Sequence, residues 1–212
     1  MAVQAGLRER KKEQTRKAIF EAARRLFDAK GFDAVTVAEV ARAADVSEVT
    51  VFNYFPAKED LFYGGMLFFE ESLIEAVRNR PRGEPALKAF RRRVMEGAEN
   101  LAARQRTEAI LSAGKVIGSS PSLAARERQI VDRYTRELAE LLAQATGAAP
   151  DDVETMAAAT AMMGTHRALV AYIRRRVLAG RRGARLAEDF KSQARRAFAR
   201  LERGLADYGV IP

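Results

Sequence analysis

Apolar residues recur every three or four positions along most of the chain, the spacing that places side chains on one face of an α-helix. No sustained alternation of apolar and polar residues predicts a strand. Breaks rich in proline, glycine or serine divide this pattern. The predicted fold class is therefore all-α, with about nine helices at 12–30, two short ones within 36–55, and then 58–79, 86–104, 107–117, 122–145, 151–179 and 184–207.

Residues 35–62 indicate two short helices joined by a tight turn. Thr36, followed three residues later by Glu39, forms a capping box, the pairing that starts a helix by satisfying two backbone N–H groups. Val40 and Ala41 then give this helix an apolar face. Residues 45–47 have the chemistry of a turn, and Ser47 is the expected N-cap of the second helix.

The second short helix has an inward and an outward face. Val51 and Phe55 lie four residues apart and are expected in the core. The outward face is expected to carry Glu48, Val49, Phe52 and Asn53. A helix this short is not stable alone, and its outward apolar residues indicate a surface that a partner covers. This arrangement is a helix-turn-helix, whose second helix enters the DNA major groove.

The segment at residues 46–61, VSEVTVFNYFPAKEDL, resembles the DNA-binding signature of the TetR family of transcriptional regulators. Upstream, residues 19–32, IFEAARRLFDAKGF, resemble the first helix of that family and its exit. The resemblance departs at Glu48, Val49 and Phe52, where a basic residue, glycine and tyrosine are common in the family. Because these positions face DNA, an uncommon operator is expected.

The resemblance implies two domains: a DNA-binding domain with a basic arm at residues 1–57, and a helical regulatory and dimerisation domain at 58–212. It also implies a homodimer on a palindromic double-stranded DNA operator, with recognition helices one DNA turn apart. The implied function is a regulator, more often a repressor, released from DNA by an unknown small-molecule effector. The helix that begins at Lys58 is the expected link between DNA heads and body.

Several residues are candidates for DNA contact. By the groove code, Asn53 suits adenine, Glu48 suits cytosine and Val49 suits a thymine methyl group. The alternative for Glu48 is a helix N-terminal role, where a carboxylate is favoured. The resemblance assigns phosphate contacts to Thr36, Thr50, Tyr54 and Lys58, and the full predicted interface also contains Ser47 and Phe52.

The chain of 212 residues has a formal net charge of +9, which favours a polyanionic partner such as nucleic acid. Many arginines are spread along helices and can simply solvate a face. More informative is the basic N-terminal arm, which includes Arg10, Lys11 and Lys12 and is expected on the phosphate backbone or in the minor groove. The alternative for the arm is a solvated, frayed terminus.

In the C-terminal region, helical spacing marks two sets of residues. The candidate ligand pocket comprises Phe69, Leu73, Met95, Ile110, Tyr134, Met162, Met163 and His166, although the same spacing suits a filled core. The family's four-helix dimer interface maps onto Leu169, Ile173, Val177, Phe190, Ala194, Ala197, Phe198 and Leu201. His166 is the only histidine, and a hydrogen-bonded core position is its usual role, with ligand contact as the alternative.

Other function classes have less support. With one histidine and no cysteine, no metal site is expected, and no cofactor is expected either. No enzyme motif occurs, and the acid pairs at 70–71 and 151–152 are interpreted as solvated faces or first-turn acids. The absence of a signal peptide or membrane-length apolar run predicts a soluble, cytoplasmic protein. Two alternatives stay open: a low-specificity architectural DNA-binding protein and a TetR-like activator without a ligand.

Overall fold

The computed structural model describes residues 2–149 and 151–205, and this part of the chain consists of helices and connecting turns, without strands. The all-α prediction is therefore confirmed. Two compact units are present, Met1–Phe68 and Phe69–Pro212. The sequence placed the boundary at the break before Lys58, whereas the packing carries the beginning of the following helix into the first unit.

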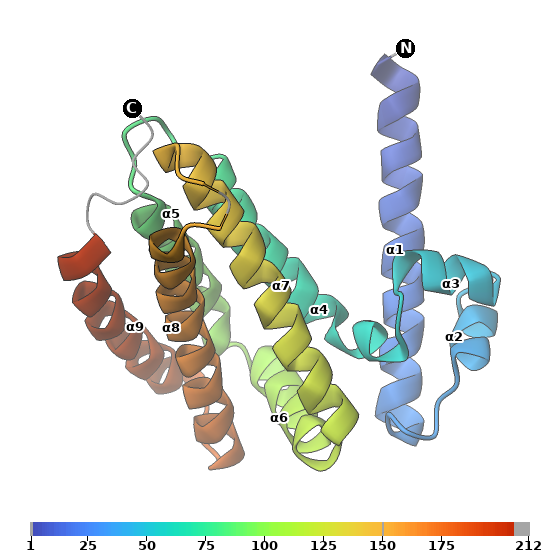
Figure 1. Cartoon of the computed structure of the whole chain (residues 1–212). Coiled ribbons are helices and arrows are strands. Elements are labelled where there is room, and N and C mark those ends of the chain that lie inside the picture. The colour runs from blue at the N-terminus through green and yellow to red at the C-terminus, as the bar shows by residue number, and fades with distance from the viewer. Residues whose placement is uncertain (1, 150, 206–212) are drawn as a thin grey trace. The chain divides into compact units, whose positions relative to one another are not determined.

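The first unit contains α1 (Ala2–Lys30), α2 (Val37–Ala43), α3 (Glu48–Tyr54) and the beginning of α4 (Lys58–Arg78) (Figure 1). Three phenylalanines form a cluster that joins α1 and α4: the ring centroid of Phe62 lies 6.2 Å from that of Phe27 and 5.7 Å from that of Phe32. A second contact of this kind joins Phe20 and Phe68, at 6.4 Å. Aromatic packing thus fixes α4 to α1 within this unit.

Gly64 permits that close approach of α4 to α1. A Cβ atom at this position would lie 2.3 Å from Cδ2 of Phe20, closer than real Cβ contacts. Glycine is required here by space rather than by backbone conformation.

The second unit contains the rest of α4 followed by α5 (Ala86–Gly97), the 3-10 helix η1 (Ala98–Ala102), α6 (Arg104–Ser119), α7 (Pro121–Thr146), α8 (Val153–Leu178) and α9 (Gly183–Leu205). α8 packs against α6, α7 and α9, and Figure 1 shows α7 and α8 side by side. The predicted helix at 86–104 is two elements, α5 and η1. The last two residues of the predicted helix at 184–207 lie outside the described residues.

Local chemistry sets the ends of α7 and α8. Ser120 caps α7, Pro121 follows as its first residue, and Gly147 ends it with a φ of 71°. Asp152 caps α8, accepting a hydrogen bond from the backbone N–H of Thr155 at 2.9 Å. That bond is the main reason why the pKa of Asp152 is lowered. Asp152 therefore has a capping role, as expected for a first-turn acid.

Among the described helices, none combines the length and apolar character needed to cross a bilayer.

Candidate functional site

The two caps of the helix-turn-helix are formed as predicted. Thr36 accepts a hydrogen bond from the backbone N–H of Glu39 at 3.2 Å, and the Glu39 carboxylate accepts one from the backbone N–H of Thr36 at 2.8 Å. Ser47 accepts a bond from the backbone N–H of Thr50 at 3.0 Å. These bonds define where α2 and α3 begin.

Four residues connect α2 to α3, and Asp45 turns the chain among them. Its φ of 53° lies in the left-handed region, which aspartate tolerates better than most residues. The backbone N–H of Val46 donates to the carbonyl of Ala41 at 3.0 Å, closing the turn. The second helix is thereby held at a defined angle to the first.

The two faces of α3 are as expected from the sequence. Val51 and Phe55 are buried, with exposed fractions of 0% and 1%. On the other face Val49 is 70% exposed and Phe52 is 46% exposed. Glu48 and Asn53 lie beside them and are also exposed. This surface therefore combines two apolar groups, a carboxylate and an amide that can reach base edges.

The positive charges near this surface lie outside α3. Helix α3 contains Glu48 and no lysine or arginine. Attraction to phosphates must come from neighbouring elements. In α1, Arg10, Lys11 and Lys12 are exposed, but they belong to a continuous helix rather than to an extended arm. The basic side chains expected of the arm are present and exposed, but their backbone is helical.

The four predicted phosphate contacts differ in their surroundings. The Thr36 side chain is exposed, while Thr50 and Tyr54 are half-buried. Lys58 donates a hydrogen bond to the carbonyl of Asp33 at 3.2 Å, and its ammonium lies 4.5 Å from the centroid of the Phe32 ring. Lys58 thus joins the start of α4 to the α1–α2 connection and is not freely solvated.

The predicted pocket residues all lie in the second unit, but they form much of its packed interior. Leu73, Met162, Met163, Tyr134 and His166 are buried, whereas Phe69, Met95 and Ile110 are half-buried. Burial also raises the pKa of Tyr134. Of this set, Phe69 and His166 are brought into direct ring contact, with centroids 5.5 Å apart.

The sequence interpretation missed Glu70, which was expected on a solvated face. Its side chain is 2% exposed, and its Oε1 atom lies 3.0 Å from Nε2 of His166. Its neighbour Glu71 is exposed, as the sequence predicted for both acids. Glu70 lies four residues after Met66 and three before Leu73, so helical spacing places it beside the apolar side of α4, and that spacing is the signal that could have identified it.

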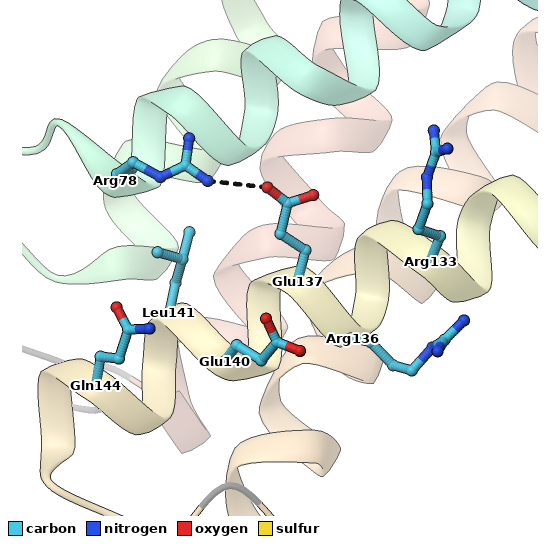
Figure 2. A pocket seen from close by; sticks show the side chains of 7 residues that line it. All are labelled: Arg78, Arg133, Arg136, Glu137, Glu140, Leu141 and Gln144. Carbon is cyan, nitrogen blue, oxygen red and sulfur yellow. Dashed lines mark hydrogen bonds and ion pairs between the residues drawn. The ribbon is translucent and has the colours of Figure 1, made fainter. Parts of the chain in front are cut away.

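A groove of about 430 Å³ lies on the surface of the second unit, where Arg78 of α4 meets α7 (Figure 2). Arg78 donates to Glu137 at 2.8 Å and also pairs with Glu75, while the guanidinium of Arg133 lies 4.7 Å from the Tyr134 ring centroid. Its lining residues are Arg78, Arg133, Arg136, Glu137, Glu140, Leu141 and Gln144. None of them belongs to the predicted pocket, and Arg78 and Glu137 form an ion pair within the groove.

The residues assigned to the dimer interface are mostly part of the chain's own core. Buried within the single chain are Leu169, Ile173, Val177, Phe190, Ala194 and Phe198, while Ala197 and Leu201 are half-buried. Helical spacing identifies a buried stripe but does not show which chain buries it. These six side chains are therefore not the surface on which a second copy would pack.

A different face of α8 is open. The small residues Ala157, Thr160, Gly164 and Ala168 are exposed at helical spacing. At the start of the same helix, Val153 and Met156 are 80% and 39% exposed and line an apolar hollow of about 580 Å³. Exposed apolar surface of this kind marks an interaction site.

The capped helix pair, the tight turn and the exposed face of α3 define a helix-turn-helix protein. Residues 19–63 match the sequence profile of the bacterial regulatory proteins of the tetR family. Over residues 19–63 the chain is therefore similar to the DNA-binding domain of the TetR family.

One curated relative is the HTH-type transcriptional regulator TcmR of Streptomyces glaucescens, which is 35% identical over 85 residues. That match covers 40% of this chain and 38% of the length of the relative. The sequence similarity therefore extends over well under half of either protein.

Solved structures resemble the chain over most of its length. A TetR-family regulator from Streptomyces coelicolor A3 has a TM-score of 0.58 at 20% identity, covering 92% of this chain and 96% of its own. GusR of Salmonella enterica has a TM-score of 0.52 at 22% identity, covering 91% and 96%. At these identities the resemblance concerns the fold alone.

Proposed function

We propose that the protein is a sequence-specific DNA-binding transcriptional regulator that places α3 in the major groove. The observation that carries this proposal is the outward face of α3, where Val49 is 70% and Phe52 is 46% exposed beside the exposed amide of Asn53. A short capped helix that leaves such side chains in solvent suits a partner that covers them. Asn53 suits adenine and Val49 suits a thymine methyl group.

We further propose that the regulator is a homodimer whose contact surface is the open face of α8. A second copy would cover Val153, Met156 and the small residues at 157, 160, 164 and 168. The interface of a two-fold dimer is self-complementary, and a helix with small outward residues can pack closely against its own symmetry mate. The two α3 helices would then read a palindromic site.

The regulatory part of the proposal is that a small molecule binds in the second unit and lowers DNA affinity, which makes the protein a repressor released by its effector. Linkage requires the effector to favour the conformation that binds DNA less well, with a coupling of about 1–3 kcal/mol. Helix α4 is the proposed route, through a change in the spacing of the two DNA-binding units. An activator without a ligand is the alternative within this family.

The test is recovery of bound duplexes from sheared genomic DNA at near-physiological salt. Wild type, Asn53→Ala and the control Asn100→Ala would be compared, since Asn100 is an exposed asparagine of the second unit. Wild type and control are expected to recover a few palindromic sites. The affinity of Asn53→Ala for these sites should be about five- to 150-fold lower, because one bidentate base contact is lost.

Uniform recovery of all fragments by all three proteins would contradict the proposal. That result would favour an architectural DNA-binding protein, because a specific regulator prefers its site by roughly 10³–10⁷-fold.

A further inference from the structure

One buried polar pair lies in the interior of the second unit. Glu70 of α4 and His166 of α8 are 2% and 5% exposed at their side chains, and Nε2 of His166 lies 3.0 Å from Oε1 of Glu70. Buried polar groups of this kind are stable only when hydrogen-bonded. This one bond satisfies half of the polar atoms that the two side chains carry.

The other half of the pair has no partner. Oε2 of Glu70 and Nδ1 of His166 are buried, and no described residue hydrogen-bonds to either atom. Leaving such atoms unsatisfied costs free energy, and two apolar side chains of similar volume would avoid that cost. The pair is therefore incompletely satisfied within the described chain, which makes it a candidate for recognition of a ligand.

Aromatic rings surround the pair. The Phe69 ring is tilted by 30° from the imidazole, with centroids 5.5 Å apart, and the Phe90 ring meets the imidazole edge-on at 6.4 Å. Phe90 continues this packing to Phe198. A flat apolar molecule would find ring contacts on more than one side.

Phe69 is also the member of this cluster nearest to solvent. Its side chain is half-buried, as is that of Arg93, whose guanidinium lies 4.7 Å from the Phe69 ring centroid and donates to Ser72 at 2.9 Å. A Cβ atom on Gly97 would lie 2.6 Å from the Phe69 ring, so the ring is closely seated. Phe69 and Arg93 thus form a cover beside the buried pair, held by contacts between side chains.

The chemistry of the free atoms selects a class of ligand. In the neutral form of His166 that donates from Nε2 to Glu70, Nδ1 is an acceptor, and a carboxylate oxygen accepts as well. Two neighbouring acceptors suit a hydrogen-bond donor, such as a hydroxyl or an ammonium group. A ligand carboxylate or phosphate would meet the like charge of Glu70.

We propose that Glu70 and His166 are the polar recognition element of the effector site, and that the effector is an aromatic or similarly flat apolar molecule bearing a hydroxyl or ammonium donor. The molecule displaces Phe69 and Arg93 and donates to Oε2 of Glu70. This inference rests on the proposed function, since it names the ligand class of the same regulatory unit.

The chain offers its own reporter. His166 is the only histidine, so its imidazole Cε1–H gives a single proton NMR signal in the full-length protein. Four probes of similar shape would be titrated: 2-phenylethylamine, 2-phenylethanol, 3-phenylpropanoate and propylbenzene. The amine, the alcohol or both should shift the signal saturably and bind about ten- to 100-fold tighter than the other two, as expected for a hydrogen bond to a charged group. The relative affinity of the amine and the alcohol identifies the donor.

Variants would locate the contact. Glu70→Gln should lower the affinity for the amine by about tenfold or more, because the charge is lost. It should lower the affinity for the alcohol less, because an amide oxygen still accepts a hydrogen bond. The control Glu71→Gln alters the exposed neighbour and should leave both affinities unchanged. The four-probe series on wild type tests the inference even where Glu70→Gln fails to fold.

Three results would overturn the inference: equal binding of all four probes, preference for the carboxylate, or no saturable shift from either donor at its solubility limit. The last result would mean that only solvent satisfies the pair. DNA binding, measured separately by fluorescence anisotropy, distinguishes a failure of this inference from a failure of the proposed function. A protein that recognises an operator but ignores both donors refutes the ligand class alone.

Discussion

At the scale of single residues, Glu39 shows how a helix cap also sets a charge. Its carboxylate accepts bonds from Lys30 at 2.6 Å and from the backbone N–H and hydroxyl of Thr36 at 2.8 and 3.1 Å. These partners, Lys30 first, lower the pKa of Glu39 from 4.5 to about 2. The folded protein therefore holds the ionised form more firmly than the unfolded chain does.

A pH dependence of stability follows from this lowered pKa. The stabilisation by Glu39 is complete above pH 4.5 and is lost as the pH falls toward about 2. We expect Glu39→Gln to reduce the acid-induced loss in free energy of unfolding over this interval, as measured by urea denaturation at a series of pH values. The exposed Glu13→Gln is the control. Equal acid sensitivity of wild type and Glu39→Gln would contradict the assignment.

The same residues show where sequence reasoning succeeds. The Thr36–Glu39 cap, the Ser47 cap and the two faces of α3 depend on contacts within a few residues, and all were predictable. The contact between Glu70 and His166 joins positions 96 apart in the chain. Helical spacing places Glu70 nearer than Glu71 to the apolar side of α4, but no local pattern identifies His166 as its partner, so that contact required the structure.

At the scale of elements, α1 starts ten residues earlier than the apolar periodicity predicted. Residues 8–13 are all charged and show no apolar period, but arginine, lysine and glutamate are good helix formers. The structure places Arg10, Lys11 and Lys12 within helix α1, exposed to solvent. Any contact of these groups with phosphates would be made from a helix.

We expect this basic segment to contribute to the salt dependence of DNA binding. Each neutralised phosphate contributes about 0.9 to the slope of log affinity against log salt, so replacing Arg10, Lys11 and Lys12 by glutamine should reduce the slope by up to about 3 for each bound chain, and by about 5 for a homodimer. Fluorescence anisotropy at several salt concentrations gives the slope. The control replaces the exposed Lys115, Arg128 and Arg136 of the second unit by glutamine and removes the same charge. Equal slopes for the two variants would show that α1 does not contact phosphates.

Helix boundaries differ in how well they can be predicted. Ser120 with Pro121, and Gly147, are strong local signals, and α7 begins and ends within one residue of the expected positions. The junction of α5 and η1 has no proline, and Gly97 is the only unusual residue there. A change from α to 3-10 geometry at this point depends on packing and was not predictable.

At the scale of the whole molecule, the proposed dimer has a specific surface. Thr160→Glu and Ala168→Glu would each place a charge on the open face of α8, twice per dimer. Burying an unpaired charge costs several kcal/mol, so we expect dissociation constants raised on the order of 100-fold or more. Sedimentation equilibrium measures this effect.

The control for this experiment is Ala18→Glu, an exposed alanine of α1 replaced by the same acid. Wild-type protein that is monomeric at micromolar concentration would end the homodimer proposal. Dimers that persist in both α8 variants would move the interface to another face. The sequence had located an interface on α8 and α9, and the solvent exposure of α8 selects the side of that helix.

Helix α4 belongs to both units. Phe68 packs on Phe20 in the first unit, and the next residue, Phe69, packs on His166 in the second. No loop separates the two interiors at this point, so a protease must cut within a helix to divide them. Melting of either unit would release half of a continuous helix and fray the other half. Heating should therefore give one cooperative transition, and a molecule that protects one unit from digestion should protect both.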